Sequence, residues 1–258
     1  MPSTIELAYS PCPNDTFIFY AMACNKIPTT FKYQPFLADV EVLNHRALCR
    51  EAPLSKISFG VFSDLKNNYT LLECGGALGF KNGPLLIASK PLDLQNTDLK
   101  IAIPGLHTTA NRLLTHFFPH LVKKTEVLFS DIEEKIVQGT ADVGLIIHES
   151  RFTYAQKGLV ELADLGNLWF NQYQLPLPLG AIVLRNDYRE MKNTIEKDIR
   201  NSIRYAYENY NEVMAYVKSY AIEMDEEVMK KHIELYVNHF SENISEEGHR
   251  AIELLTGL

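Results

Sequence analysis

The sequence predicts an α/β protein of two lobes that are joined by a two-strand hinge, with a ligand cleft between the lobes. Strand-like and helix-like stretches alternate over residues 1–185, which is typical of α/β architecture with mainly parallel sheets. One order of elements, a strand, a proline-bearing loop and a capped helix, occurs twice. Two apolar segments, residues 83–89 and 179–185, are entered by glycine and proline and are typical of strands that cross a hinge.

The first strand–loop–helix unit lies near the start of the chain. Residues 5–9 have the alternation of a strand, and the loop at residues 10–15 reads SPCPND. Two prolines forbid regular structure in that loop, so we expect the helix to begin near Phe17. One of the polar residues at 14–16 is expected to cap it.

The second unit repeats this order in the middle of the chain. Residues 99–103 form the strand, residues 104–107 the loop, and Thr108, Thr109 and Ala110 open the helix. The repeat is one of architecture and not of sequence identity. It predicts that, in each lobe, the end of this strand, the loop and the start of the helix face the cleft.

Each unit is followed by a helix and a buried strand. A helix at residues 42–49 precedes an apolar strand at residues 57–62, and a helix at residues 132–138 precedes a strand at residues 143–147. Gly139 is the expected stop of the second helix.

These elements predict the extent of the lobes. The larger lobe comprises residues 1–88 and 181–258, and the smaller lobe comprises residues 89–180. After residue 185 the chain is helical: apolar residues recur about every fourth position over residues 195–217, and two helices follow at residues 226–240 and 245–255. We expect the tyrosines of this tail to lie on helix surfaces and not to form a ligand-binding site.

Composition excludes several classes of protein. With 258 residues, 46% hydrophobic and 22% charged, the chain can bury a sizeable core and is not disordered. Its net charge of -7 and the lack of a Lys/Arg cluster argue against a nucleic-acid partner. The four cysteines form no C-x-x-C pair, and the apolar runs are too short for a membrane span. We therefore expect a cytoplasmic protein with reduced thiols, no membrane partner and an oligomeric state that the sequence does not indicate.

His148 is the candidate for acid–base chemistry. It stands at the carboxyl end of the strand at residues 143–147, where ligands bind in open α/β sheets, and imidazole transfers protons near neutral pH. A zinc motif is absent, because no second histidine follows four positions later. Glu149 is a candidate to orient the ring, His107 competes for the role, and a purely structural histidine is the alternative.

Other small polar residues are candidates for binding. The helix start at Thr109 and Ala110 suits a carboxylate or phosphate, although it can equally be a simple cap. Asn44 lies at a helix start and Ser58 within an apolar strand, where its hydroxyl requires either a structural partner or a ligand. Cys12 has no basic neighbour in sequence, which argues against a nucleophile.

Five stretches of the chain carry a family resemblance. They are residues 10–17 (SPCPNDTF), 108–110 (TTA), 147–154 (IHESRFTY), 176–180 (PLPLG) and 232–238 (HIELYVN). Through them the chain resembles the 1,4-dihydroxy-6-naphthoate synthase family of the futalosine route to menaquinone. The resemblance runs from about residue 5 to the end.

The resemblance implies a periplasmic-binding-protein-like fold of type II that is used as an enzyme. It implies a lyase that converts cyclic dehypoxanthinylfutalosine, a small-molecule carboxylate, to 1,4-dihydroxy-6-naphthoate without a cofactor or a metal. His148 would be the general base, and Asn44, Ser58, Thr109 and Ala110 would hold the substrate. Two alternatives stay open: a chorismate dehydratase of the same pathway, and a non-catalytic protein that binds a small carboxylate.

Overall fold

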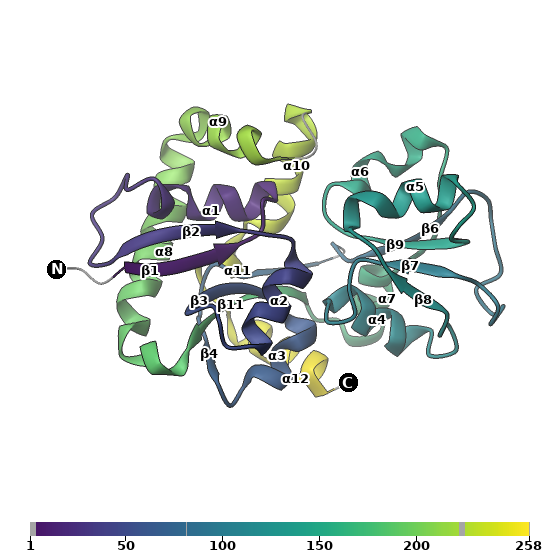
Figure 1. Ribbon diagram of the computed structural model, residues 1–258, viewed down its shortest axis with the longest axis horizontal. Coiled ribbons are helices and arrows are strands. Elements are labelled where there is room, and N and C mark those ends of the chain that lie inside the picture. Colours follow the sequence, from purple (N-terminus) through teal and green to yellow (C-terminus); the bar gives the residue numbers. More distant parts are fainter. Residues whose placement is uncertain (1–3, 81, 222–224, 258) are drawn as a thin grey trace.

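Two mixed β-sheets, each flanked by helices, form two lobes that lie side by side (Figure 1). The computed structural model describes residues 4–80, 82–221 and 225–257. Within these ranges no helix is both long and apolar enough to cross a lipid bilayer. The two-lobe α/β prediction is confirmed.

The sheet of the larger lobe contains six strands. Its order is β2-β1-β3-β11-β4, and β5 also pairs with β11. The strands are β1 (Thr4–Tyr9), β2 (Lys32–Leu37), β3 (Leu54–Ser58), β4 (Tyr69–Leu71), β5 (Ala77–Gly79) and β11 (Leu177–Arg185). Strands β1, β2 and β3 are parallel, whereas β11 runs antiparallel to all of its neighbours.

Helices pack on both faces of this sheet, because alternate residues of β11 are buried on opposite sides. Ile182 and Leu184 join the core beneath α1 and α8, while Ala181 and Val183 join the core beneath α3 and α12. The helices of this lobe are α1 (Pro13–Ala23), α2 (Val40–Leu48), α3 (Phe59–Leu65), α8 (Lys192–Glu208), α9 (Tyr210–Tyr220), α10 (Glu226–Tyr236), α11 (His239–Glu242) and α12 (Glu246–Gly257), with the 3-10 turn η3 (Asn186–Met191).

The sheet of the smaller lobe contains five strands in the order β10-β6-β9-β7-β8. The strands are β6 (Leu85–Ala88), β7 (Ile101–Ile103), β8 (Lys124–Glu126), β9 (Val143–Ile146) and β10 (Val160–Asp164). Helices α4 and α7 pack on one face and α5 on the other. The helical segments are α4 (Thr109–Phe117), η1 (Phe129–Asp131), α5 (Ile132–Val137), α6 (Ser150–Thr153), η2 (Tyr154–Lys157) and α7 (Leu165–Tyr173).

The chain passes between the lobes twice, just before β6 and just before β11. Strand β6 pairs with β9 and β10, so residues 85–88 belong to the smaller sheet and their assignment to the larger lobe was wrong. Strand β11 joins the larger sheet from Leu177 onward, four residues before the expected start of that lobe at residue 181. The expectation of mainly parallel sheets was also wrong, because strands that follow a crossover enter antiparallel to their neighbours.

Several elements differ in their ends from the sequence prediction. The strand expected at residues 57–62 ends at Ser58, where α3 begins. Helix α1 starts at Pro13 with no side-chain cap, because proline needs no N–H partner in the first turn. The tail helix is interrupted at Asn209, which separates α8 from α9. Gly139, at φ +69°, follows α5 as predicted.

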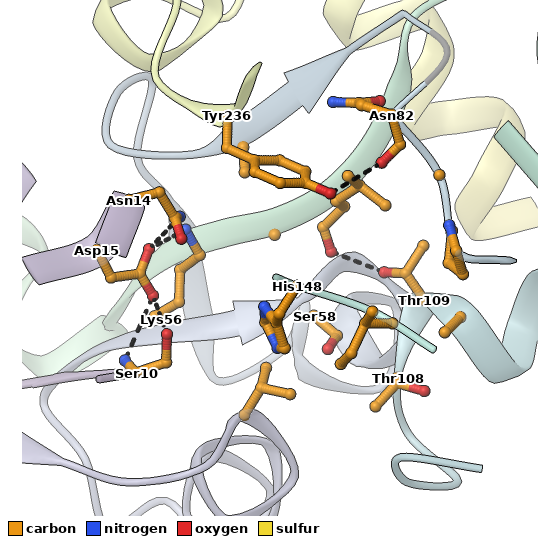
Figure 2. A pocket seen from close by; sticks show the side chains of 18 of the residues that line it. Ser10, Asn14, Asp15, Lys56, Ser58, Asn82, Thr108, Thr109, His148 and Tyr236 are labelled. Carbon is orange, nitrogen blue, oxygen red and sulfur yellow. Dashed lines mark hydrogen bonds and ion pairs between the residues drawn. The ribbon is translucent and has the colours of Figure 1, made fainter. Parts of the chain in front are cut away.

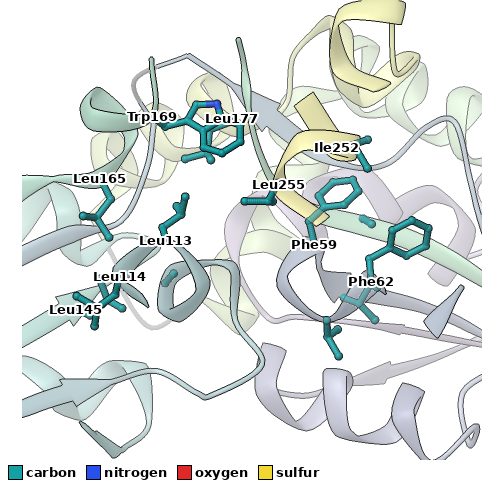
Figure 3. Close-up of a cluster of buried hydrophobic side chains, with 14 of the residues drawn as sticks. Phe59, Phe62, Leu113, Leu114, Leu145, Leu165, Trp169, Leu177, Ile252 and Leu255 are labelled. Carbon is teal, nitrogen blue, oxygen red and sulfur yellow. The ribbon is translucent and has the colours of Figure 1, made fainter. Parts of the chain in front are cut away.

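The two lobes share one hydrophobic cluster where α3 meets α4. Leu113 and Leu114 of α4 lie on the side of the smaller lobe, and Phe59 and Phe62 of α3 lie on the side of the larger lobe (Figure 3). The contact is close because α3 carries Gly60: a Cβ atom there would lie 2.7 Å from the Thr108 carbonyl carbon. This packing brings the first turns of α3 and α4 together at the edge of the cleft.

Candidate active site

A pocket lies between the lobes and is lined by residues of both (Figure 2). It encloses about 690 Å³ between the protein atoms, including the part that opens to solvent. The polar and ionisable residues of its wall are Ser10, Asn14, Asp15, Lys56, Ser58, Asn82, Thr108, Thr109, His148, Arg151, His232 and Tyr236. Of the five predicted site residues, Ser58, Thr109, Ala110 and His148 line this pocket, and Asn44 does not.

His148 follows β9 and extends into the pocket between the Asp15–Lys56 group and the start of α4 (Figure 2). Its backbone has φ +60°, a left-handed conformation that a non-glycine residue adopts at a cost and that occurs at functional sites. Its Nε2 atom is buried and has no hydrogen-bond partner among the described residues. Burial lowers the pKa of His148 to about 4, so its imidazole is neutral at pH 7.

Cys12, in the turn before α1, is the hydrogen-bond partner of the His148 ring. Its Sγ lies 3.4 Å from Nδ1. Burial raises the pKa of the Cys12 thiol well above its ordinary value, so the sulfur is not a thiolate nucleophile at neutral pH. Ligand atoms of Cys12, His148 and Glu149 lie within 4.8 Å of one another, and within the described part of the chain this is the group spaced closely enough to hold a metal ion.

The start of α4 supplies backbone donors to the opposite side of the pocket. The Thr108 Oγ1 accepts from the N–H of Asn111 and caps the helix, as predicted. The Thr109 Oγ1 donates to the carbonyl of Leu179 at 2.8 Å and accepts from the N–H of Gly60 at 3.0 Å. First-turn N–H groups and the helix dipole at Thr109 and Ala110 favour an anion here.

Asn44 lies behind the pocket wall and holds Ser58. Its Oδ1 accepts from the Ser58 N–H at 2.8 Å, and its Nδ2 donates to the Ser58 Oγ at 3.2 Å. The same Nδ2 donates to Glu41, whose other carboxylate oxygen meets His107 of the smaller lobe. The amide of Asn44 is therefore fully engaged by protein groups, and His107 shapes the loop before α4.

A buried polar group that sequence reasoning missed occupies the wall next to α1. The carboxylate of the buried residue Asp15 accepts from Lys56 Nζ at 2.7 Å and from Asn14 Nδ2 at 2.8 Å through Oδ1. Its Oδ2 accepts from the Ser10 hydroxyl at 2.7 Å. Sequence reasoning interpreted residues 10–16 as a turn or a helix cap and so did not predict a buried carboxylate there. The signal that could have indicated one is Lys56, because a lysine within the buried strand β3 requires an acidic partner.

Helix α10, near the C-terminal end of the chain, contributes two further residues to the pocket. His232 and Tyr236 are both buried and line the wall. The Tyr236 hydroxyl donates to the carbonyl of Asn82, in the segment between β5 and β6, at 3.3 Å. The expectation that the tail tyrosines lie on the helix surface was wrong for Tyr236, because its side of α10 lines the pocket.

Arg151, at the start of α6, connects the loop that carries His148 to the segment before β6, where the chain passes between the lobes. Its Nη1 donates to the carbonyl of Gly83 at 2.5 Å, and its Nη2 lies 3.6 Å from the Asp164 carboxylate. Arg151 lines the pocket as well. The position of His148 is thus coupled to the segment that links the lobes.

Comparison with known proteins agrees with this architecture. A family model described as "Menaquinone biosynthesis" matches residues 5–258. A Thermus thermophilus protein named 1,4-dihydroxy-6-naphtoate synthase is 42% identical over 252 residues, which are 97% of this chain and 92% of that protein. A solved structure of a protein from Archaeoglobus fulgidus, 33% identical, superposes with a TM-score of 0.94 over 98% of this chain and 96% of that one.

More distant structures are similar in fold alone. The periplasmic aliphatic sulphonate binding protein from Escherichia coli, 10% identical, aligns with a TM-score of 0.66 over 100% of this chain and 86% of that one. The fold is therefore that of the periplasmic binding proteins, and the cleft between its lobes carries a half-buried histidine, His148. Together with the synthase relative, this fold defines an enzyme built on a binding-protein scaffold. The chain belongs to the 1,4-dihydroxy-6-naphthoate synthase family of menaquinone biosynthesis.

Proposed function

We propose that this enzyme is a lyase that converts cyclic dehypoxanthinylfutalosine to 1,4-dihydroxy-6-naphthoate, with His148 as the general base. The observation that carries the proposal is the Nε2 of His148, which is buried at the pocket between the lobes and has no hydrogen-bond partner among the described residues. A base must be unprotonated at working pH and must reach the substrate, and burial meets the first condition here.

The remaining pocket residues support a position for the substrate. The carboxylate of the substrate accepts hydrogen bonds from the N–H groups of Thr109 and Ala110 in the first turn of α4. Ser58, held in place by Asn44, contacts the substrate from the larger lobe. The bound molecule then bridges the two lobes next to His148.

His148 removes a proton from the substrate and starts the elimination of the ribose-derived part. Formation of the aromatic ring drives this step, and closure of the lobes excludes water and fixes the reacting geometry. The mechanism assigns no step to a metal or redox cofactor. The cytoplasmic location stays a prediction.

The test is turnover of the purified protein with cyclic dehypoxanthinylfutalosine, followed by mass spectrometry. We expect the naphthoate from the unsubstituted protein and a loss of about 100- to 10,000-fold in rate for His148→Ala. His249→Ala is the matched control, because His249 pairs with Glu73 and does not line the pocket.

Other outcomes separate the alternatives. Loss of water from chorismate in a parallel incubation, without naphthoate formation, would identify a chorismate dehydratase. Binding of the substrate without turnover would identify a carboxylate-binding protein. Equal rates for His148→Ala and the unsubstituted protein would keep the reaction and remove His148 as its base.

A further inference from the structure

His232 is a second histidine of the pocket to which no role has been given so far. It lies on α10 in the larger lobe and is 1% exposed. Its ring is nearly parallel to that of His148, with 20° between the planes and 6.3 Å between the centroids. Two imidazoles from opposite lobes therefore line the same cavity.

The hydrogen bonds around Asp15 define which nitrogen of His232 carries the proton. A carboxylate only accepts, so the Asn14 amide that meets Asp15 Oδ1 at 2.8 Å does so through its Nδ2 group. The Asn14 Oδ1 must then face His232, whose Nε2 lies 2.9 Å away. Because an amide oxygen also only accepts, the Nε2 of His232 is the donor.

The other nitrogen of His232 is consequently a lone-pair acceptor. Burial, reinforced by the neighbouring His148, Lys56 and Arg151, lowers the pKa of His232 well below its ordinary value, so the ring is neutral and Nδ1 carries no proton. The Nδ1 atom is buried without a hydrogen-bond partner among the described residues. A buried acceptor of this kind requires a donor, and the protein supplies none within the described part of the chain.

We propose that the Nδ1 of His232 accepts a hydrogen bond from a hydroxyl group of the ribose-derived part of the substrate. This inference rests on the function proposed above for the identity of the ligand. A hydroxyl is the donor that a sugar-derived group offers, whereas the carboxylate of the substrate has no hydrogen to donate. His232 thus orients the part that leaves, while His148 acts on the ring system.

The network behind His232 makes this acceptor rigid. Lys56 and Ser10 hold Asp15, Asp15 holds Asn14, and Asn14 holds the His232 ring. The acceptor therefore needs no reorganisation when the substrate binds, which is the property expected of a residue that selects for a hydroxyl.

The first test is His232→Gln, in which the side-chain amide can still donate to Asn14 while the Nδ1 acceptor is lost. We expect kcat/KM to fall about 10- to 100-fold with little change in the urea midpoint of unfolding. His249→Gln is the matched control, because it makes the same change outside the pocket.

Deoxy analogues of the substrate make the test specific. Removal of the hydroxyl that His232 contacts should lower kcat/KM in the unsubstituted protein and have little further effect in His232→Gln. Equal losses in both proteins for every hydroxyl would assign His232 a structural role and overturn the inference.

Nitrogen NMR of the histidine rings gives a readout that does not depend on turnover. We expect the Nε2–H tautomer for His232 in the free protein, and a shift of the Nδ1 resonance when His148→Ala binds the substrate. An Nδ1–H tautomer, or an Nδ1 signal that the bound substrate leaves unmoved, would overturn the inference. If the unsubstituted protein converts the substrate and His232→Gln does so equally well, only the His232 inference fails. If the unsubstituted protein neither binds nor converts it, both proposals fail.

Discussion

The Sγ of Cys12 lies 3.4 Å from the Nδ1 of His148, and this contact joins the larger lobe to the smaller one. For Nε2 to act as a base, Nδ1 must carry the proton of the neutral ring and donate it toward sulfur. Burial raises the pKa of the thiol, so the sulfur serves as a neutral, weak acceptor. If His148 is the base, as proposed, Cys12 accepts from Nδ1, selects the tautomer of the base and is not itself a nucleophile.

Replacement of Cys12 tests this role. We expect Cys12→Ser to keep kcat within a few-fold, because its hydroxyl also accepts from Nδ1, and Cys12→Ala to lower kcat about 3- to 10-fold through loss of one hydrogen bond. Steady-state kinetics measure both. A nucleophilic cysteine would instead make both variants inactive. In a thiol titration of the native protein, exposed Cys49 should react well before buried Cys12.

The pH profile of kcat/KM reports the protonation of the free base. Because burial lowers the pKa of His148 to about 4 and the base acts only when unprotonated, activity should stay level from neutral pH down to about pH 5. It should fall to half near pH 4. Circular dichroism at each pH serves as the control for unfolding. A midpoint near 6.5, the ordinary histidine value, would contradict the burial of this ring.

Gly60 governs how closely the lobes approach. In Gly60→Ala the new Cβ would lie 2.7 Å from the Thr108 carbonyl carbon and 2.8 Å from the Thr109 nitrogen, both of them backbone atoms. The two helix starts must therefore move apart, and we expect KM to rise by about tenfold or more, since misplacement of binding groups is costly. Gly257→Ala is the matched control, because a Cβ there meets nothing within 4 Å. An unchanged KM for Gly60→Ala would show that the lobes need not meet at this point.

Lys56 and Asp15 form an ion pair whose side chains are only 6% and 2% exposed. Lys56→Met leaves the Asp15 charge buried and unpaired, so the free energy of unfolding should fall by about 3–5 kcal/mol in urea denaturation. Lys123→Met is the control: its pair with Asp98 is 51% and 82% exposed, and such pairs contribute about 1 kcal/mol or less. A loss for Lys56→Met no larger than that of the control would contradict the burial of this pair.

Local sequence features predicted much of the fold. Hydrophobic alternation located β1, a short apolar run located β9, a threonine cap located α4, and Gly139 marked the end of α5. The prediction failed where an apolar run continues from a strand into the helix that follows it. Residues 57–62 are apolar almost throughout, and this composition does not distinguish the end of β3 from the buried first turn of α3.

The candidate site was predictable only in part. Ser58, Thr109, Ala110 and His148 line the pocket, as strand ends and helix starts suggest they should. Asn44 was expected to hold the substrate, but the structure places its amide on Ser58 and Glu41. Nothing local distinguishes an asparagine that faces a ligand from one that supports its neighbour.

The sequence by itself determined the order of elements, the two strand–loop–helix units and the place of His148 after β9. These features were predictable because hydrophobic periodicity, proline-bearing loops and helix caps depend on residues that are close in the chain. Only the tertiary structure decided that β6 and β11 pair antiparallel within their sheets. It also decided that His232 meets Asn14 across 218 positions, and that burial makes both pocket histidines neutral. Pairing partners and pKa values depend on which distant residues exclude water from a site, and that is settled only when the chain has folded.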